Sequence, residues 1–250
     1  MSNVNLFNGI TITVEGTSNT YHSYDDWGLY VTNTDCIGEP KQYKKYIQIP
    51  GRSGQLDLSQ AQTGRPIFIS REIKINLTGT RFRTNWDSVM SAFRNSIAGR
   101  VCRITFDNDP SYYWHGKVDV KGFESVLNLG KFTIEIPDAD PYKYDLQSSA
   151  EPWLWDPFNF ETGVIIQAGS LVVEGTDSIT INKGHMPTCP ELVVSDMLLS
   201  TFTVTYDNVS YPLVVGSNKI PAILVGGEND VTLTFTGWAT VQVVYRSGSL

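Results

Sequence analysis

The second half of the chain consists of short runs of β-branched and aromatic residues, separated at close spacing by turn-forming residues. Such runs predict β-strands, because β-branched side chains pack well on a pleated sheet and lose rotamer freedom in a helix. The spacing is typical of an antiparallel β-sandwich of about a hundred residues. Its strands are expected at 164–166, 171–173, 179–181, 191–194, 202–206, 211–215, 231–235 and 241–245.

The first half also reads mainly as strands, at 10–14, 67–69, 73–77, 101–106, 112–120 and 131–136. One segment, near 85–98, has the period of a helix instead. Its apolar residues recur at a spacing that places them on one face, and they are Trp86, Val89, Met90, Phe93 and Ile97. Gly99 follows where a helix C-terminal glycine belongs.

Prolines and acidic residues near 138–144 predict a domain boundary, with domains at 1–140 and 141–250. Charge is spread unevenly across it. The first 145 residues hold 16 basic and 16 acidic residues, whereas the remainder holds 3 basic and 10 acidic residues. This balance argues against nucleic-acid binding by the second half, because phosphate contacts need clustered cations. A simple drift in composition between two domains explains the asymmetry equally well.

Other function classes find little support. No apolar run is long enough to span a membrane, and the N-terminus does not read as a signal peptide. Cys36, Cys102 and Cys189 are too widely spaced for a disulfide framework or a zinc site. No nucleophile, phosphate-loop or metal motif is present, so we expect no enzyme activity, cofactor or metal. A glycan hydrolase built from distant carboxylates stays open, since spacing alone does not reveal such a pair.

The loop at 41–64 is the main candidate for a functional contact. Pro50, Gly51 and Gly54 predict a tight turn, and polar and apolar residues alternate after it. The loop is basic, with Asp57 as its only acid. Two readings compete here: an ordinary exposed hairpin with solvated charges, or a segment that packs on a neighbouring subunit. The residues expected to make that contact are Lys44, Lys45, Arg52, Leu56 and Leu58.

Taken in order, these features resemble the distal tail proteins of long-tailed bacteriophages, also called siphovirus tail components. The resemblance runs over nearly the whole chain, and with it we favour the subunit contact. It is carried by the loop at 50–58, the helix with Trp86, and the segments 71–75, 104–107, 113–118, 141–144, 226–231, 235–237 and 243–246.

The resemblance implies a mainly β fold, with an N-terminal β-rich domain that has one α-helix and then a galectin-like antiparallel β-sandwich. Residues 1–140 would form a ring, commonly a hexamer, with 41–64 as a protruding belt; 141–250 would lie on its periphery. The implied function is a structural hub in the virion tail tip, made in the host cytoplasm. Implied partners are other copies of the chain, the tail tube protein, a tail-associated lysin or fibre, and receptor-binding proteins. No membrane and no sequence-specific nucleic acid is expected.

An alternative function is a carbohydrate-binding module that contacts host cell-wall glycans. Trp153 and Trp155 would share one face of an extended segment, and tryptophan faces are common stacking platforms for sugars. Buried aromatic residues, however, more often pack cores and interfaces. The sequence leaves both roles open for these two side chains and favours packing.

Overall fold

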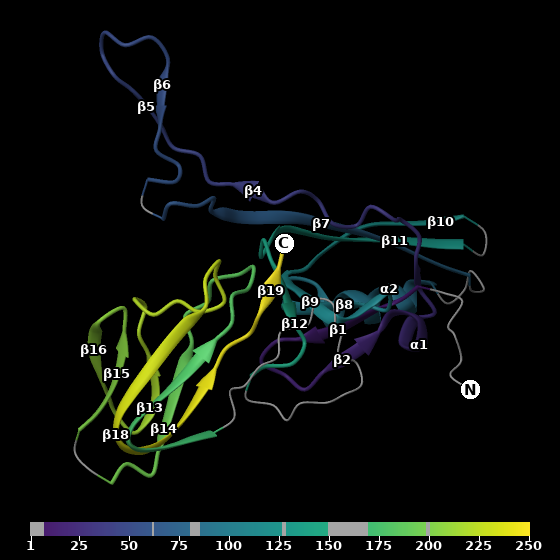
Figure 1. Ribbon diagram of the computed structural model, residues 1–250. Coiled ribbons are helices and arrows are strands. Elements are labelled where there is room, and N and C mark those ends of the chain that lie inside the picture. The colour runs from purple at the N-terminus through teal and green to yellow at the C-terminus, as the bar shows by residue number, and fades with distance from the viewer. Residues whose placement is uncertain (1–7, 62, 81–85, 127–128, 150–169, 199–200) are drawn as a thin grey trace. The chain divides into compact units, whose positions relative to one another are not determined.

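The computed structural model describes residues 8–61, 63–80, 86–126, 129–149, 170–198 and 201–250 of the 250-residue chain (Figure 1). The chain divides into two compact units, Met1–Lys143 and Tyr144–Leu250. Antiparallel strands make up most of the described part of both units. The mainly β fold class predicted from the sequence is therefore confirmed.

The first unit contains two antiparallel sheets. Its elements are β1 (Ile10–Val14), β2 (Thr20–His22), α1 (Ser23–Trp27), β3 (Tyr30–Val31), β4 (Lys41–Gln42), β5 (Tyr46–Gln48), β6 (Gln55–Asp57), β7 (Phe68–Thr80), α2 (Trp86–Ile97), β8 (Val101–Phe106), β9 (Asp109–Lys117), β10 (Asp119–Val126) and β11 (Leu129–Ala139). One sheet contains the run β9-β8-β1-β2, and the other has the order β10-β11-β7-β3, with β4 also paired to β7. Strands β5 and β6 pair with each other.

One hydrophobic core joins both sheets of the first unit to α2. Phe93 is fully buried in it, with ring centroids 4.8 Å from Trp27 and 5.4 Å from Phe132. Gly99 has a φ of 73°, which suits the residue after a helix. The apolar stripe predicted for this helix is confirmed, because its five members are all buried: Trp86, Val89, Met90, Phe93 and Ile97.

A second helix, α1, was not predicted. It spans five residues, too few to show a periodic pattern. His22 caps its start, because the ring Nδ1 accepts the backbone N–H of Asp25 at 3.3 Å. The backbone N–H of His22 in turn donates to the Asp26 carboxylate at 2.7 Å. This reciprocal cap stabilises a helix that is too short to be stable by propensity alone.

The second unit is an antiparallel β structure with its own hydrophobic core. Its sheet has the order β16-β15-β18-β14-β17, and β13 pairs along the other edge of β18. Two short strands, β12 and β19, pair with each other. The elements are β12 (Lys143–Asp145), β13 (Ser170–Ile181), β14 (Glu191–Ser195), β15 (Phe202–Tyr206), β16 (Val209–Leu213), β17 (Gly216–Lys219), β18 (Val231–Val244) and β19 (Gly248–Ser249).

Strand β18 is the central element of the second unit. On one edge it pairs with β13 over twelve residue pairs. On the other edge β15 pairs with residues 234–236 and β14 with residues 240–244. Gly175 and Gly237 face each other in the β13–β18 ladder, with φ values of 97° and 129°. Such glycines mark sharp bends in strands, and β18 is strongly curved (Figure 1).

Several strands are longer than predicted. The expected pairs 67–69 with 73–77, 171–173 with 179–181, and 231–235 with 241–245 are each one continuous strand, β7, β13 and β18. The residues between the strands of the second unit were interpreted as turns, and residues 70–72 were assigned to no strand. In the structure these residues continue the β-ladders. Ser70 pairs with Lys41 of β4, and Gly237 pairs with Gly175 of β13. Backbone pairing therefore outweighs the local turn preference of these residues.

Other boundaries also differ. Strand β9 begins at Asp109 rather than at residue 112, and β10 follows it as a separate strand that was not predicted. Strand β16 ends at Leu213, and the two valines after it, expected to lie in the strand, are exposed. The predicted strand 164–166 lies outside the described residues.

Candidate functional site: a projecting arm

Residues 41–67 form an arm that extends away from the rest of the first unit (Figure 1). The chain leaves the unit at β4, passes through the β5–β6 hairpin and returns at the start of β7. The two ends of the arm lie side by side, because Gln42 pairs with Phe68 and the Tyr43 N–H donates to the Ile67 carbonyl at 2.8 Å. The arm is thus a single excursion from one pair of neighbouring strands.

The base of the arm is firmly attached. Lys41 Nζ lies 3.6 Å from an Asp138 carboxylate oxygen, and Ser70 Oγ donates to the same carboxylate at 3.3 Å. The rings of Phe68 and Tyr142 meet edge-on with centroids 6.3 Å apart. These contacts fix the direction in which the arm leaves the unit.

Arg71 adds a buried cation just beyond the base. Its side chain is buried, and the guanidinium stacks 4.6 Å above the Trp114 ring. Burial lowers the pKa of Arg71, and the charge of Glu39 opposes that shift. Stacking on an aromatic face compensates in part for the water that a buried guanidinium loses.

The outer part of the arm has little internal support. Strands β5 and β6 share three residue pairs, Tyr46–Asp57, Ile47–Leu56 and Gln48–Gln55. Beyond them, the Leu58 N–H donates to the Lys45 carbonyl at 2.8 Å. An isolated two-stranded hairpin is at best marginally stable in water, so this segment gains most from a surface to pack against.

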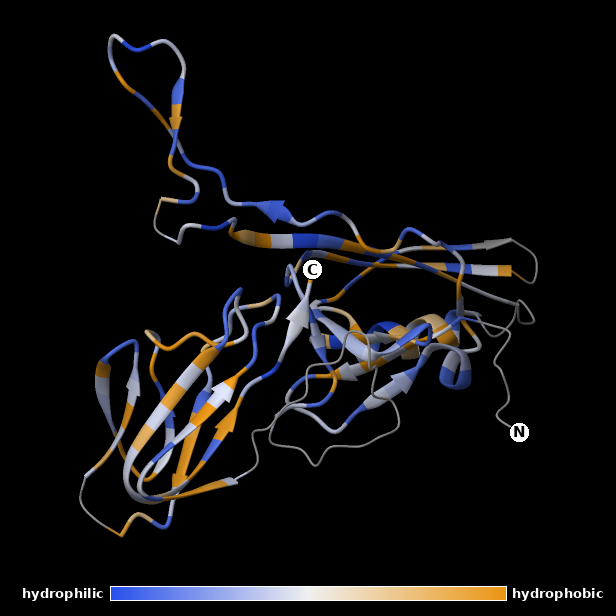
Figure 2. Ribbon diagram, in the orientation of Figure 1, coloured by the Kyte–Doolittle hydropathy of each residue, from blue (hydrophilic) through white to orange (hydrophobic). Residues whose placement is uncertain are grey.

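Apolar side chains are concentrated on the arm and its junction with β7. Of the seventeen large apolar side chains that are exposed among the described residues, six lie between positions 43 and 69. Figure 2 shows hydrophobic segments along the otherwise polar arm. Exposed apolar clusters of this kind mark interaction surfaces. The six are Tyr43, Tyr46, Ile47, Ile49, Ile67 and Ile69.

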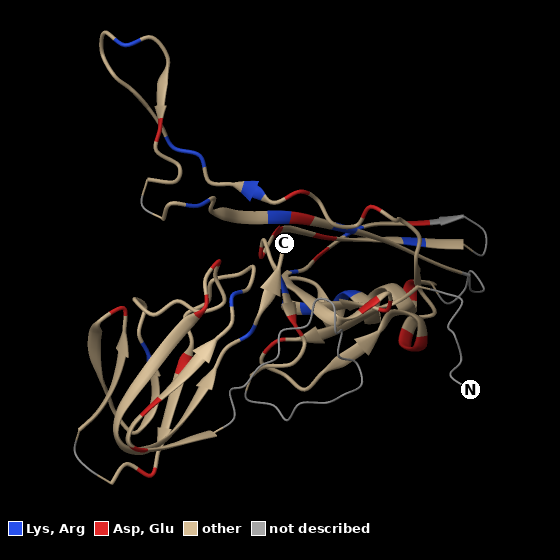
Figure 3. Ribbon diagram, viewed as in Figure 1, with Lys and Arg blue, Asp and Glu red and all other residues tan. Residues whose placement is uncertain are grey.

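All five predicted contact residues lie on the arm. Lys44, Lys45 and Arg52 are exposed, and Leu56 and Leu58 are half-buried. Figure 3 shows basic segments along the arm. The hairpin register brings Leu56 opposite Ile47, whereas Arg52 lies in the turn beyond β5. The apolar side chains of the incoming strand were missed, although the pattern Tyr46-Ile47-Gln48-Ile49 contains the signal.

Asp57 is the only acidic residue of the loop at 41–64, and its carboxylate is stabilised in the charged form. The Ser59 backbone N–H donates to the Asp57 carboxylate at 2.8 Å. Hydrogen bonds from Ser59, with a smaller contribution from Lys44, lower the pKa of Asp57. Asp57 therefore acts mainly within the arm, and the cations Lys44, Lys45 and Arg52 define its outward charge.

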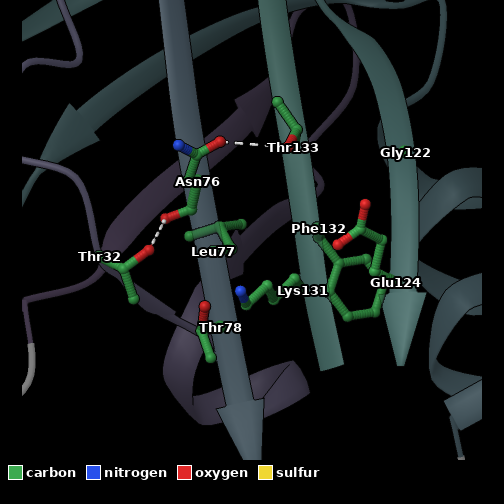
Figure 4. A pocket seen from close by; sticks show the side chains of 9 residues that line it. All are labelled: Thr32, Asn76, Leu77, Thr78, Gly122, Glu124, Lys131, Phe132 and Thr133. Atoms are coloured by element: carbon green, nitrogen blue, oxygen red, sulfur yellow. Dashed lines mark hydrogen bonds between the residues drawn. The ribbon is translucent and has the colours of Figure 1, made fainter. Parts of the chain in front are cut away.

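A shallow hollow of about 280 Å³ lies on the β10–β11–β7 sheet (Figure 4). Three of its polar residues are bonded to one another. Thr133 Oγ1 donates to Asn76 Oδ1 at 3.1 Å, and Thr32 Oγ1 donates to the Asn76 carbonyl at 3.1 Å. Glu124 and Lys131 also line the hollow, which shares no lining residue with the arm.

Trp153 and Trp155, considered for glycan stacking, lie outside the described residues. Within the described part, no group of three or more His, Cys, Asp and Glu side chains has the arrangement of a metal site. No helix in that part has the length and apolar character needed to cross a bilayer.

No protein-family model and no curated protein matches the chain. Among solved structures, the fold is similar to that of the phage SPP1 protein Dit (gp 19.1), described as a paradigm of the hub adsorption apparatus in phages that infect Gram-positive bacteria. The TM-score is 0.62 at 14% sequence identity, over 96% of this chain and 99% of that chain. The resemblance to distal tail proteins drawn from the sequence motifs is thus confirmed at the level of the fold.

Proposed function

We propose that this chain is the structural hub of a phage tail tip, in which identical copies form a closed ring. The match in fold with a phage hub protein covers almost the whole chain and so includes both units. In this proposal the ring joins the tail tube to baseplate, tail-fibre and receptor-binding proteins of the virion. The role is structural, without catalysis.

The observation that carries the proposal is the arm. It has a fixed base, a weakly supported hairpin and a concentration of exposed apolar side chains. A free monomer gains nothing from this combination, whereas a neighbouring copy would bury the apolar side chains and could pair with the open edges of the hairpin. Contacts in which one copy's arm packs on the next are head-to-tail, and such contacts close into a ring when the rotation from one copy to the next permits it.

The position of the arm also assigns a role to each unit. The arm belongs to the first unit, so the ring contact is assigned to residues 1–140 with the belt at 41–64. The second unit, residues 141–250, is assigned to the periphery, where it would be free to meet other tail-tip proteins. The proposed number of copies in the ring, six, rests on the sequence resemblance alone.

Replacement of the arm tests the proposal. Because Tyr43 and Ile67 are hydrogen-bonded neighbours, residues 44–66 can be exchanged for a short glycine-containing turn without moving the base. Light scattering or native mass spectrometry should find a defined oligomer for the full chain and a monomer for this variant. Assembly to the same mass without the arm, or a full chain that stays monomeric at high concentration, would refute the clasp.

A matched pair of double substitutions refines the test. Tyr46→Ser with Ile47→Ser removes two exposed apolar side chains from the arm, which are 50% and 42% exposed. Val214→Ser with Val215→Ser removes two from the second unit, which are 64% and 62% exposed. The arm pair should weaken assembly and the control pair should leave it unchanged. Equal effects of the two pairs would show that the arm has no special part in assembly.

A further inference from the structure

The outer face of the second unit's sheet is rich in hydroxyl groups. Along β18, buried apolar residues alternate with outward-facing ones, so that Leu233 and Phe235 are fully buried while Thr236 is exposed. The ladders place Thr176 of β13 and Thr203 of β15 directly on either side of Thr236. Three adjacent strands thus present a continuous row of threonine side chains to solvent.

A hollow of about 440 Å³ opens at one end of this row. It lies where β18 changes partners, because the β15 ladder ends at Thr236 and the β14 ladder begins at Thr240. Four threonines line it, together with the indole of Trp238 and the backbone of two glycines. Its volume falls within the range of about 300–1,000 Å³ that is usual for small-molecule sites.

The two glycines keep the floor of the hollow open. A Cβ atom on Gly237 would lie 2.8 Å from the Thr201 carbonyl oxygen, so this position does not admit a side chain. Its ladder partner Gly175 has a φ of 97° and faces open space. With no side chain at either position, both glycines line the hollow with backbone atoms.

Trp238 gives the hollow an aromatic wall. Its side chain is 40% exposed, although it lies in the middle of the longest strand of the unit. Its backbone is fixed, since the Trp238 carbonyl accepts the N–H of Leu198 at 3.0 Å. An indole held at the rim of a cavity presents a large apolar face at little cost in conformational entropy.

The chemistry of the lining selects the class of ligand. A sugar ring has one apolar C–H face, which stacks on an indole, and a rim of hydroxyl groups, which exchange hydrogen bonds with threonine hydroxyls. No charged residue lines the hollow among the described residues, and Glu174 faces Trp238 across the ladder. Residues 146–250 carry 10 acidic and 3 basic residues, so an anionic ligand is repelled.

We infer that this hollow binds a neutral glycan, with a sugar ring stacked on Trp238 and its hydroxyl groups bonded to Thr176, Thr203 and Thr236. The residues named here are other than Trp153 and Trp155, the two considered in the sequence analysis. It goes beyond the hub function and does not depend on ring formation, because every residue that forms it belongs to one copy of the second unit.

An array that holds neutral oligosaccharides of glucose, galactose and N-acetylhexosamines, together with anionic glycans, tests the inference with the full chain. The strongest neutral oligosaccharide on the array is then titrated by calorimetry. Trp238→Ala should weaken binding at least tenfold, whereas Trp238→Phe, which keeps an aromatic face, should retain most of it. Val209→Ala, which changes another exposed apolar side chain of the same unit, should bind like the unchanged chain.

Three outcomes would overturn the inference: no neutral oligosaccharide binds, only anionic glycans bind, or Trp238→Ala binds as well as the unchanged chain. Thermal unfolding of each variant shows whether the unit stays folded. If Trp238→Ala does not fold, Thr236→Val replaces it, since valine keeps the shape and removes one hydroxyl. That variant should bind several-fold more weakly, and unchanged affinity would equally refute the site.

Discussion

At the scale of single residues, His115 stands out because carboxylates contact both of its ring nitrogens. Nδ1 lies 2.9 Å from Asp140 and Nε2 lies 3.0 Å from Glu15. Both nitrogens must carry a proton to donate to two carboxylates, so the charged imidazolium is favoured. The hydrogen bond to Asp140 is the largest cause, and the pKa of His115 rises to about 9. His115 also lowers the pKa of Glu15.

This cluster predicts a pH-dependent stability. Because the pKa of His115 is raised from 6.5 to about 9, its contribution is complete below pH 6.5 and is lost as the pH rises toward 9. His115→Gln should therefore lower the free energy of unfolding by about 1–2 kcal/mol just below pH 6.5, where ordinary carboxyl groups are still ionised, a value reduced for partial solvent exposure. The loss should shrink above the raised pKa. Urea unfolding at a series of pH values measures it.

His185→Gln provides the control, since His185 is an exposed histidine of the other unit. It should change the free energy of unfolding by less than about 0.5 kcal/mol, as expected for an exposed side chain. A His115→Gln variant whose deficit stays constant across the pH range would show that the ion pairs with Glu15 and Asp140 do not stabilise the fold.

The contact between His115 and Glu15 could not be predicted from the sequence. Glu15 lies 100 positions from His115, and only the pairing of β1, β8 and β9 brings the two together. Trp238 was missed for a related reason. Its strand was interpreted as two short strands with a turn between them, and a tryptophan in a turn gives no indication of a cavity.

At the scale of elements, the strength of local patterns decided what could be predicted. Helix α2 was predicted nearly to the residue, because its five apolar positions share one face that the core buries. The long strands β7, β13 and β18 were not, since their continuity depends on ladder partners far away in the sequence. In the arm, the alternation at Leu56 and Leu58 indicated the strand after the turn, whereas the similar alternation at 46–49 was missed.

The packing of α2 yields a second prediction. Phe93→Ala removes a fully buried ring that contacts Trp27 and Phe132, and should cost about 3–5 kcal/mol of unfolding free energy. Ser91→Ala, at an exposed position of the same helix, should change it by less than about 0.5 kcal/mol. Guanidinium unfolding of both variants gives the comparison. A small loss for Phe93→Ala would mean that the core does not depend on this contact.

At the scale of the whole molecule, assembly and stability should be linked. If copies associate through the arm, the folded oligomer is favoured by mass action, and the apparent melting temperature rises with protein concentration. The variant with residues 44–66 replaced by a short turn should melt at one temperature at all concentrations. Differential scanning calorimetry over a range of concentrations makes the measurement. A concentration-independent midpoint in the full chain would contradict association through the arm.

The fold could be predicted from the sequence, but the direction of the arm could not. The order of loop, helix and strand motifs was enough to identify the fold, which the match to Dit confirms. The direction of the arm was not predictable, because it is set by contacts of its base, such as that between Ser70 and Asp138, which lie 68 positions apart.

The alternation along β18 has an evolutionary consequence. Its even-numbered side chains from Thr232 to Trp238 face solvent and its odd-numbered ones from Leu233 to Val243 face the core, with Gly237 at the bend between them. A single residue inserted before Leu233 would exchange the two sets beyond the insertion and put threonines where leucine and phenylalanine now pack. Length changes in this half of the chain should therefore accumulate in the connections, or occur in β18 by two residues at a time, while substitutions remain free to alter the solvent-facing set.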